Sequence, residues 1–158
     1  MMGADPEFLL FYGTKHMDAS QTLKYFLPKA GLTAIQGQMG YKVEGHGNLG
    51  WDGSNSTAEI RPTPEKNIDT LTEHIGELLK VAANSLPFAD MTTLSIGNPT
   101  GGHIHVDITE KINEITGNER NYSKIRKIVA TFLMPIIASD NRICAANRVK
   151  GTGYGRAD

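Results

Sequence analysis

The segment 101–107, Gly-Gly-His-Ile-His-Val-Asp, constrains the fold most, because polar and apolar residues alternate along it. Alternation with a period of two is typical of a β-strand, whose successive side chains point to opposite faces. His103, His105 and Asp107 are therefore expected to share one face. On the other face, three apolar residues are expected to enter a core: Ile104, Val106 and Ile108. The polar face fits a set of metal ligands, or an amphipathic strand whose exposed side carries two histidines.

Length and composition favour a single domain. The chain has 158 residues and a formal net charge of -1, with no basic block or acidic tail. This charge balance gives no indication of a nucleic-acid or membrane partner. A long apolar run and an N-terminal signal are both missing, and the lone Cys144 fits a reducing compartment. We therefore expect a cytoplasmic protein.

The N-terminal third predicts a strand and a short helix. Residues 7–12 are dense in apolar and aromatic side chains and predict an opening strand. Residues 14–36 are ambiguous, although Asp18 is suited to cap a short helix that ends at Pro28. That helix would carry three apolar residues: Leu23, Phe26 and Leu27. Glycine then recurs through residues 37–53, which disfavours a regular element throughout and indicates tight turns or a loop close to a ligand.

The middle of the chain predicts a strand followed by a long helix. Residues 57–61 form the strand, with Glu59 and Arg61 on one face and Ile60 on the other. Thr63 is suited to cap the helix, which we expect over residues 64–84. One stripe of this helix is expected to be buried. Its members are Ile68, Leu71, Ile75, Leu78, Leu79 and Ala82.

The remaining elements complete a mixed pattern. Residues 92–96 predict a strand that leads through a long loop into the His-x-His strand, as in an antiparallel hairpin. A second amphipathic helix is predicted over residues 122–139, with a kink at Pro135. Because strands and helices do not alternate strictly, the fold class is α+β, a mainly antiparallel sheet with helices packed on one face.

Polar residues of three predicted strands are expected to converge on the uncovered face of this sheet. They are Asp5, Glu7, Glu59, Arg61, His103, His105 and Asp107. Carboxylates with an occasional histidine suit Mg²⁺ or Mn²⁺, and an arginine suits a phosphate or a carboxylate. His-x-His with a carboxylate also fits zinc or iron. Alternatively, Glu59 and Arg61 are solvated neighbours on a surface strand.

Three short motifs occur in an order that resembles a known family. They are Gly-Ala-Asp-Pro-Glu-Phe at 3–8, Ala-Glu-Ile-Arg-Pro at 58–62 after Asp52-Gly53, and Gly-Gly-His-Ile-His-Val at 101–106. Together they resemble the phage-associated carboxylate-amine ligases of the amidoligase group, which are relatives of glutamine synthetase. The resemblance implies half of a glutamine-synthetase-like catalytic domain, in the host cytoplasm if the gene is phage-encoded. It also implies ATP- and Mg²⁺-dependent (or Mn²⁺-dependent) formation of an amide from a carboxylate and an amine, through an acyl phosphate.

The resemblance also implies roles for particular residues. The implied metal ligands are Glu7, Glu59 and His105, with Asp5 and His103 beside them. Arg61 and Arg156 are the implied catalytic clamps on the transferring phosphoryl group, which fits the need of that chemistry for cationic contacts. Arg61 and Gly53 are the implied cofactor-binding residues. The expected substrates are a small-molecule or peptide carboxylate and an amine.

The resemblance ends at the C-terminus. Residues 154–158 resemble the Tyr-Gly motif of the family, which normally leads into further strands, but the sequence stops at Asp158. We therefore expect residues 1–158 to form a single domain that lacks the family's C-terminal part. A second copy or a partner chain is then expected to complete the sheet. Two alternatives remain: a non-catalytic phage assembly or binding protein on the same scaffold, and a metal-dependent hydrolase or oxygenase that uses His103, His105 and Asp107.

Overall fold

The computed structural model describes residues 1–93 and 100–107. The chain divides into two units after Asp107, and all of the described residues belong to the first unit. The predicted helix over 122–139, the Tyr-Gly motif and Arg156 lie outside the described residues.

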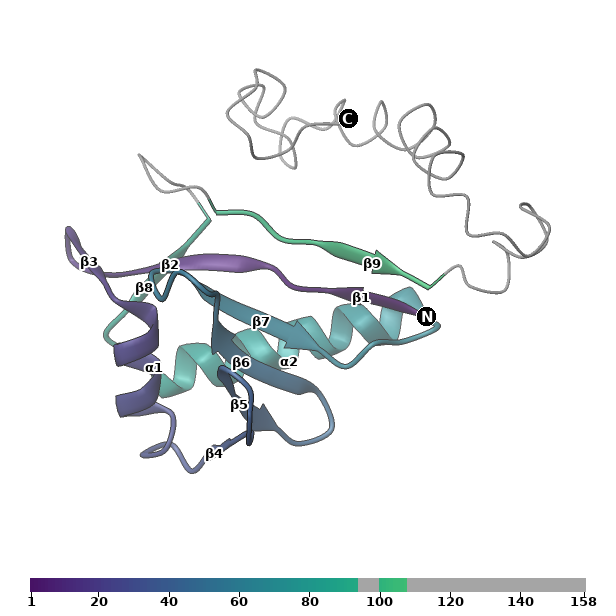
Figure 1. The fold of residues 1–158 in the computed structure, drawn as a ribbon, viewed down its shortest axis with the longest axis horizontal. Coiled ribbons are helices and arrows are strands. Elements are labelled where there is room, and N and C mark those ends of the chain that lie inside the picture. Colours follow the sequence, from purple (N-terminus) through teal and green to yellow (C-terminus); the bar gives the residue numbers. More distant parts are fainter. Residues whose placement is uncertain (94–99, 108–158) are drawn as a thin grey trace, which may run out of the picture. The chain divides into compact units, whose positions relative to one another are not determined.

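The described residues form an α+β fold with antiparallel strand pairing, as predicted (Figure 1). The main sheet has the order β3-β2-β7-β6-β5-β4, and β8 pairs with β2. Its strands are β2 (Glu7–Tyr12), β3 (Lys15–Met17), β4 (Thr33–Ala34), β5 (Gly40–Val43), β6 (Gly47–Trp51), β7 (Ala58–Pro62) and β8 (Asp90–Thr92). A separate two-stranded sheet contains β1 (Met2–Ala4) and β9 (Ile104–Val106).

The opening strand and the first helix agree with the sequence prediction. Strand β2 has the predicted bounds, Glu7–Tyr12. Helix α1 (Ala19–Phe26) is capped by Asp18, whose carboxylate accepts a hydrogen bond of 2.7 Å from the backbone N–H of Gln21. The ambiguous residues before and after this helix contribute two short strands, β3 and β4.

The glycine-rich region forms two paired strands, so the expectation of a largely irregular segment was wrong. Strands β5 and β6 pair in antiparallel register from Gly40↔Gly50 to Val43↔Gly47. The apolar residues that alternate with the glycines and polar residues are buried in the main core: Tyr41, Val43, Leu49 and Trp51. Burial of this alternating set therefore outweighed the low strand propensity of glycine.

The long helix starts later than predicted. Helix α2 spans Ile68–Ser85, and its cap is Asn67, which accepts a hydrogen bond of 2.8 Å from the backbone of Asp69. Thr63 is not the cap, because the chain after it is held extended by a bridge between Glu65 and Met2, with backbone hydrogen bonds of 2.7 and 2.8 Å. Ile68 is therefore the first helical residue and is 57% exposed, contrary to the prediction.

The rest of the predicted stripe of α2 faces the core. Leu71, Leu78 and Ala82 are buried, and Ile75 and Leu79 are partly buried against the core. The sequence analysis missed His74, which lies on the same stripe and is also buried.

The predictions around the His-x-His strand were correct in part. Strand β8 ends at Thr92, and the remainder of the predicted strand, residues 94–96, lies outside the described residues. Strand β9 pairs with β1 and not with β8, so the predicted hairpin was wrong. Ile104 is 74% exposed and does not enter a core, because β9 belongs to a two-stranded sheet whose described partner is β1.

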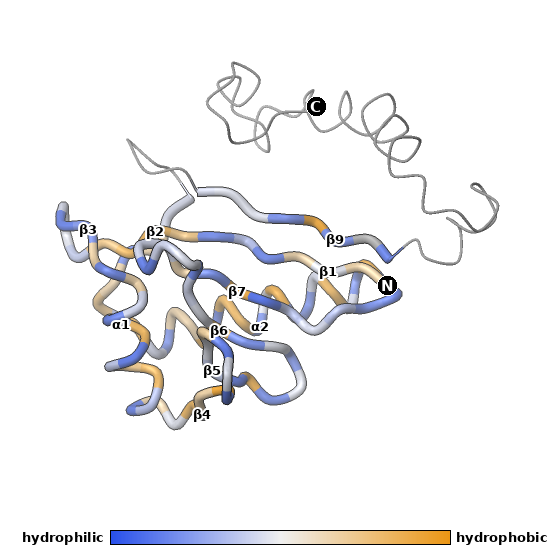
Figure 2. The backbone as a smooth tube through the Cα atoms, viewed as in Figure 1, coloured by the Kyte–Doolittle hydropathy of each residue, from blue (hydrophilic) through white to orange (hydrophobic). Residues whose placement is uncertain are grey.

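The helices and the polar residues use opposite faces of the main sheet. Ile60 and Leu49 belong to the same buried cluster as Leu78 and Ala82 of α2, and α2 contacts β6 and β7 (Figure 1). Glu59 and Arg61 alternate with Ile60 along β7 and therefore point away from α2. The mixed hydropathy along these strands and along α2 in Figure 2 is consistent with one buried face each. None of the helices in the described ranges is long and apolar enough to cross a membrane.

Candidate functional site

The site begins where the N-terminal segment meets the segment before β9. The backbone N–H of Asp5 donates to His103 at 3.1 Å, and that of Glu7 donates to Gly101 at 3.1 Å. Gly102, between them, has φ +155°, and a Cβ built on it would lie 3.2 Å from the Cα of Pro6. Only glycine therefore allows the two segments to approach this closely. The two family-like motifs, 3–8 and 101–106, thus contact each other directly.

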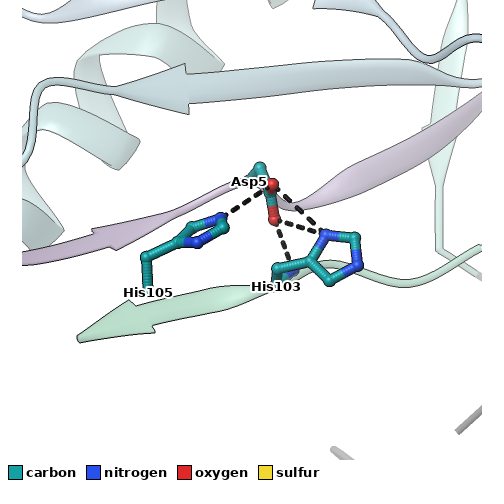
Figure 3. A group of neighbouring side chains, drawn as sticks. All are labelled: Asp5, His103 and His105. Carbon is teal, nitrogen blue, oxygen red and sulfur yellow. Dashed lines mark hydrogen bonds and ion pairs between the residues drawn. The ribbon is translucent and has the colours of Figure 1, made fainter. Parts of the chain in front are cut away.

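Asp5, His103 and His105 form a cluster of side chains that converge on one point (Figure 3). Nδ1 of His103 lies 3.1 Å from Oδ1 of Asp5, and Nε2 of His105 lies 3.1 Å from Oδ2. One oxygen or nitrogen of each side chain lies within 4.8 Å of the others. The Asp5 side chain is 17% exposed, whereas His103 and His105 are 71% and 66% exposed. The carboxylate is therefore anchored while the imidazoles remain open to solvent.

The electrostatics of Asp5 favour its ionised form. Partial burial alone would raise its pKa, but the pKa is lowered overall by hydrogen bonds from the His105 side chain and the His103 backbone and by the two nearby imidazoles. The backbone N–H of His103 also donates to this carboxylate. Asp5 is thus an ionised carboxylate beside two imidazoles, and the three side chains could together hold a metal ion.

Two further carboxylates lie on the neighbouring strands. Glu7 of β2 and Glu59 of β7 are directly opposite each other in antiparallel register, which places both side chains on the same face. Oε2 of Glu7 accepts a hydrogen bond of 2.7 Å from the backbone N–H of Gly101, so this carboxylate is tied to the segment that leads into β9. Through this hydrogen bond, Glu7 connects the main sheet to the segment that carries His103 and His105.

Glu59 is the most deeply buried of these acids, with a side chain that is 10% exposed. Burial raises its pKa above the ordinary value; Arg61 opposes this rise, and the negative charges of Asp5 and Glu7 add to it. Three carboxylates are thus close enough to influence one another. Such a concentration of negative charge is what a bound divalent cation would neutralise.

The grouping of the predicted ligands in the structure differs from the one expected from the sequence. Among the described residues, the set that can hold one ion contains Asp5 with the two histidines; Glu7, Glu59 and Asp107 are not members of it. Asp107 lies past the end of β9, where its backbone N–H donates to the carbonyl of Met1 at 2.7 Å, and its carboxylate is outside the cluster. The expectation that Asp107 joins the histidines was therefore wrong.

The other predicted site residues have different environments. Arg61 is 29% exposed and bonds to Glu59 and to three further acceptors, two on β6 and one at the residue preceding β5. Gly53 lies in the exposed turn between β6 and β7. The sequence analysis missed Asn48, whose amide oxygen accepts from Arg61 at 3.3 Å. Its position one residue before the buried Leu49 would have identified its face, had the glycine-rich region been interpreted as a strand.

The residues of this face could hold a cation, with a guanidinium beside it. A family model described as Phage phiEco32-like COOH.NH2 ligase-type 2 matches residues 2–155. The match covers nearly the whole chain, including all three motifs that bring these residues together. No curated protein and no solved structure matches the chain.

Proposed function

Because the chain belongs to the phage phiEco32-like COOH.NH2 ligase-type 2 family, we propose that it couples a carboxylate to an amine at the expense of ATP. In this proposal the carboxylate is activated as an acyl phosphate and the amine then displaces phosphate to give the amide. The expected substrates are a small-molecule or peptide carboxylate and an amine. Membership of the family supports carboxylate-amine ligation in general. The use of ATP and the acyl phosphate are our proposal.

The donor set on the sheet fits divalent cations. Asp5, Glu7 and Glu59 offer carboxylate oxygens, which suit Mg²⁺ and Mn²⁺, and the two imidazoles of His103 and His105 suit transition metals such as Mn²⁺ or Zn²⁺ as additional ligands. Bound cations would neutralise the phosphate oxygens that gather during phosphoryl transfer. The chain itself fixes two of these carboxylates: Gly101 orients Glu7, and His103 and His105 orient Asp5.

One observation supports this proposal most strongly. Residues near position 5, near position 59 and near position 103 meet on a single face, and these are the three motifs within the family match. A face that only stabilised the fold would not need to bury Glu59 beside two other acids, because burial and these acids raise its pKa and so make its ionised form less favourable. The arrangement is explained if a cation binds there.

The test is nucleotide and metal binding by the full chain. Calorimetry should detect binding of ATP in the presence of excess Mg²⁺ or Mn²⁺, and Glu59→Gln should weaken it. Lys80→Ala is the matched control, because Lys80 is exposed on α2, which covers the opposite face of the sheet, and pairs with Glu77 at 2.5 Å. If folded wild-type protein binds no ATP with either metal, the ligase proposal fails and a non-catalytic phage assembly or binding role replaces it.

A second candidate function has a specific observation in its favour. The cluster of two histidines and one carboxylate, with Asp5 in place of the predicted Asp107, is a donor set that also suits the zinc or iron of a hydrolase or oxygenase. Tight Zn²⁺ or Fe²⁺ binding without any ATP binding would favour this alternative. Under that outcome Glu59→Gln should leave metal binding unchanged, because Glu59 is outside the cluster.

A further inference from the structure

Arg61 has an unusually complete set of hydrogen-bond acceptors. Nη1 donates to the carbonyl of Met39 at 3.2 Å and to Oδ1 of Asn48 at 3.3 Å. Nη2 donates to the carbonyl of Trp51 at 3.0 Å and to Oε2 of Glu59. The two terminal nitrogens of a guanidinium carry four hydrogens in total, so each of these hydrogens has one acceptor. A phosphoryl group gripped through these nitrogens would have to displace a protein acceptor.

The neighbouring backbone is shaped to accept this guanidinium. Gly50 is paired with Glu59 on one side and with Gly40 on the other, so both glycines lie on the same face as Arg61. A Cβ at Gly50 would lie 2.5 Å from Nη1 of Arg61, and a Cβ at Gly40 would lie 2.8 Å from Oδ1 of Asn48. Side chains at these two positions would therefore push the guanidinium and its acceptor away. The flat glycine surface leaves room for Arg61 to lie across β7, β6 and β5.

From this geometry we propose that Arg61 is a positioning residue, which fixes the carboxylate of Glu59 and does not grip the transferring phosphoryl group. Oε2 of Glu59 is bound to Arg61. The other carboxylate oxygen is then the one presented to the face shared with Glu7 and Asp5. Asn48 supports Arg61 from the next strand. This role rests on the proposed function, because it takes Glu59 as a metal ligand.

The first experiment needs no metal. In ¹⁵N NMR of the full chain, the two Nη groups of a held guanidinium give separate signals, whereas free rotation averages them. We expect separate Nη signals for Arg61 in wild-type protein, and merging of these signals in Asn48→Ala and in Glu59→Gln. A single averaged signal in the folded wild-type protein would overturn the proposal.

The second experiment measures Mn²⁺ binding by electron paramagnetic resonance, without nucleotide. Loss of a group that orients a metal ligand typically weakens metal binding by about 10- to 100-fold. We expect a reduction in this range for Arg61→Lys, whose single nitrogen cannot reach four acceptors, and a smaller one for Asn48→Ala. Lys80→Ala, on α2 and outside this network, should bind Mn²⁺ like wild type.

The outcomes separate the two proposals. If Arg61→Lys and Asn48→Ala are folded by thermal unfolding and bind Mn²⁺ like wild type, Arg61 does not position Glu59. Unchanged Mn²⁺ binding together with weaker ATP binding in Arg61→Lys would identify Arg61 as a phosphate clamp and overturn the proposal. If wild-type protein binds neither Mn²⁺ nor ATP, the proposed function fails, while separate Nη signals that merge in Glu59→Gln would still show that Arg61 holds Glu59.

Discussion

Asp5 and Glu59 lie in the same site but are held in opposite ways. Asp5 accepts hydrogen bonds from residues that are nearly one hundred positions away, and its pKa is lowered because these bonds and the two imidazoles outweigh partial burial. Burial and two neighbouring acids raise the pKa of Glu59, although its partner Arg61 is only two residues away on the same strand. The surroundings of Asp5 stabilise its ionised form, whereas the surroundings of Glu59 make its ionised form less favourable. Such an unfavourable charge is typical of a functional site.

The largest expected effect tests the Asp5 cluster. We expect Asp5→Asn to reduce Co²⁺ binding, followed by its visible absorption spectrum, below detection, because the amide removes the anionic ligand between the two imidazoles. Asp107→Asn is the matched control and should bind Co²⁺ like wild type, since Asp107 is outside the cluster. Loss of binding in Asp107→Asn with retention in Asp5→Asn would restore the ligand set expected from strand parity.

The second prediction concerns the face of the sheet that packs against α2, which we expect to contribute to stability. Leu78 of α2 is fully buried in the cluster that contains Ile60, the neighbour of Glu59. Leu78→Ala should lower the free energy of unfolding in urea by about 2 to 5 kcal/mol, because it removes buried methyl groups and leaves a cavity. Ile68→Ala, at an exposed position of the same helix, should change it by less than about 0.5 kcal/mol. Equal losses of unfolding free energy in the two variants would contradict the exposed position of Ile68 at the start of α2.

The third prediction compares the two carboxylates by pH. The raised pKa of Glu59 means that its ionised form disfavours folding, so this contribution lowers stability as the pH rises from the ordinary value of 4.5 through the folded pKa. Glu59→Gln should remove this loss. The lowered pKa of Asp5 means that its contribution is present above 3.8 and is lost as the pH falls through the folded pKa, so Asp5→Asn should be destabilising at neutral pH. Urea unfolding between pH 3 and 7 measures both effects. We expect each variant to change the free energy of unfolding by on the order of 1 kcal/mol.

At neutral pH we therefore expect these two substitutions to change the free energy of unfolding in opposite directions. A Glu59→Gln variant that is as destabilised as Asp5→Asn would show that the contact with Arg61 dominates over burial, contrary to the direction of the pKa.

The smallest expected effect concerns Ile104. The sequence places it in a core, whereas the structure leaves it 74% exposed on β9. Ile104→Thr keeps a β-branched side chain, so the free energy of unfolding should change by less than about 0.5 kcal/mol. A loss above about 2 kcal/mol, the cost of truncating a buried side chain, would show that this face is covered.

Much of the fold could be predicted from local patterns. The bounds of β2, the cap of α1 and the faces of Glu59, Arg61 and Ile60 all followed from alternation or from capping chemistry. The start of α2 did not, because both Thr63 and Asn67 are suitable caps, and the bridge between Glu65 and the distant Met2 keeps the chain extended between them. The glycine-rich strands were missed because burial of Tyr41 and Trp51, a tertiary effect, outweighs propensity.

By itself the sequence determined which side chains share a face along each strand, since a period of two is a local property of the backbone. It also contained the three motifs that indicated the family. Only the tertiary structure decided that Asp5, and not Asp107, lies between His103 and His105, because this depends on the register of β1 against β9. It likewise decided that Arg61 meets acceptors on β7, on β6 and at the residue preceding β5. Register between distant segments depends on contacts that no local period contains, so these partners could not be read from spacing.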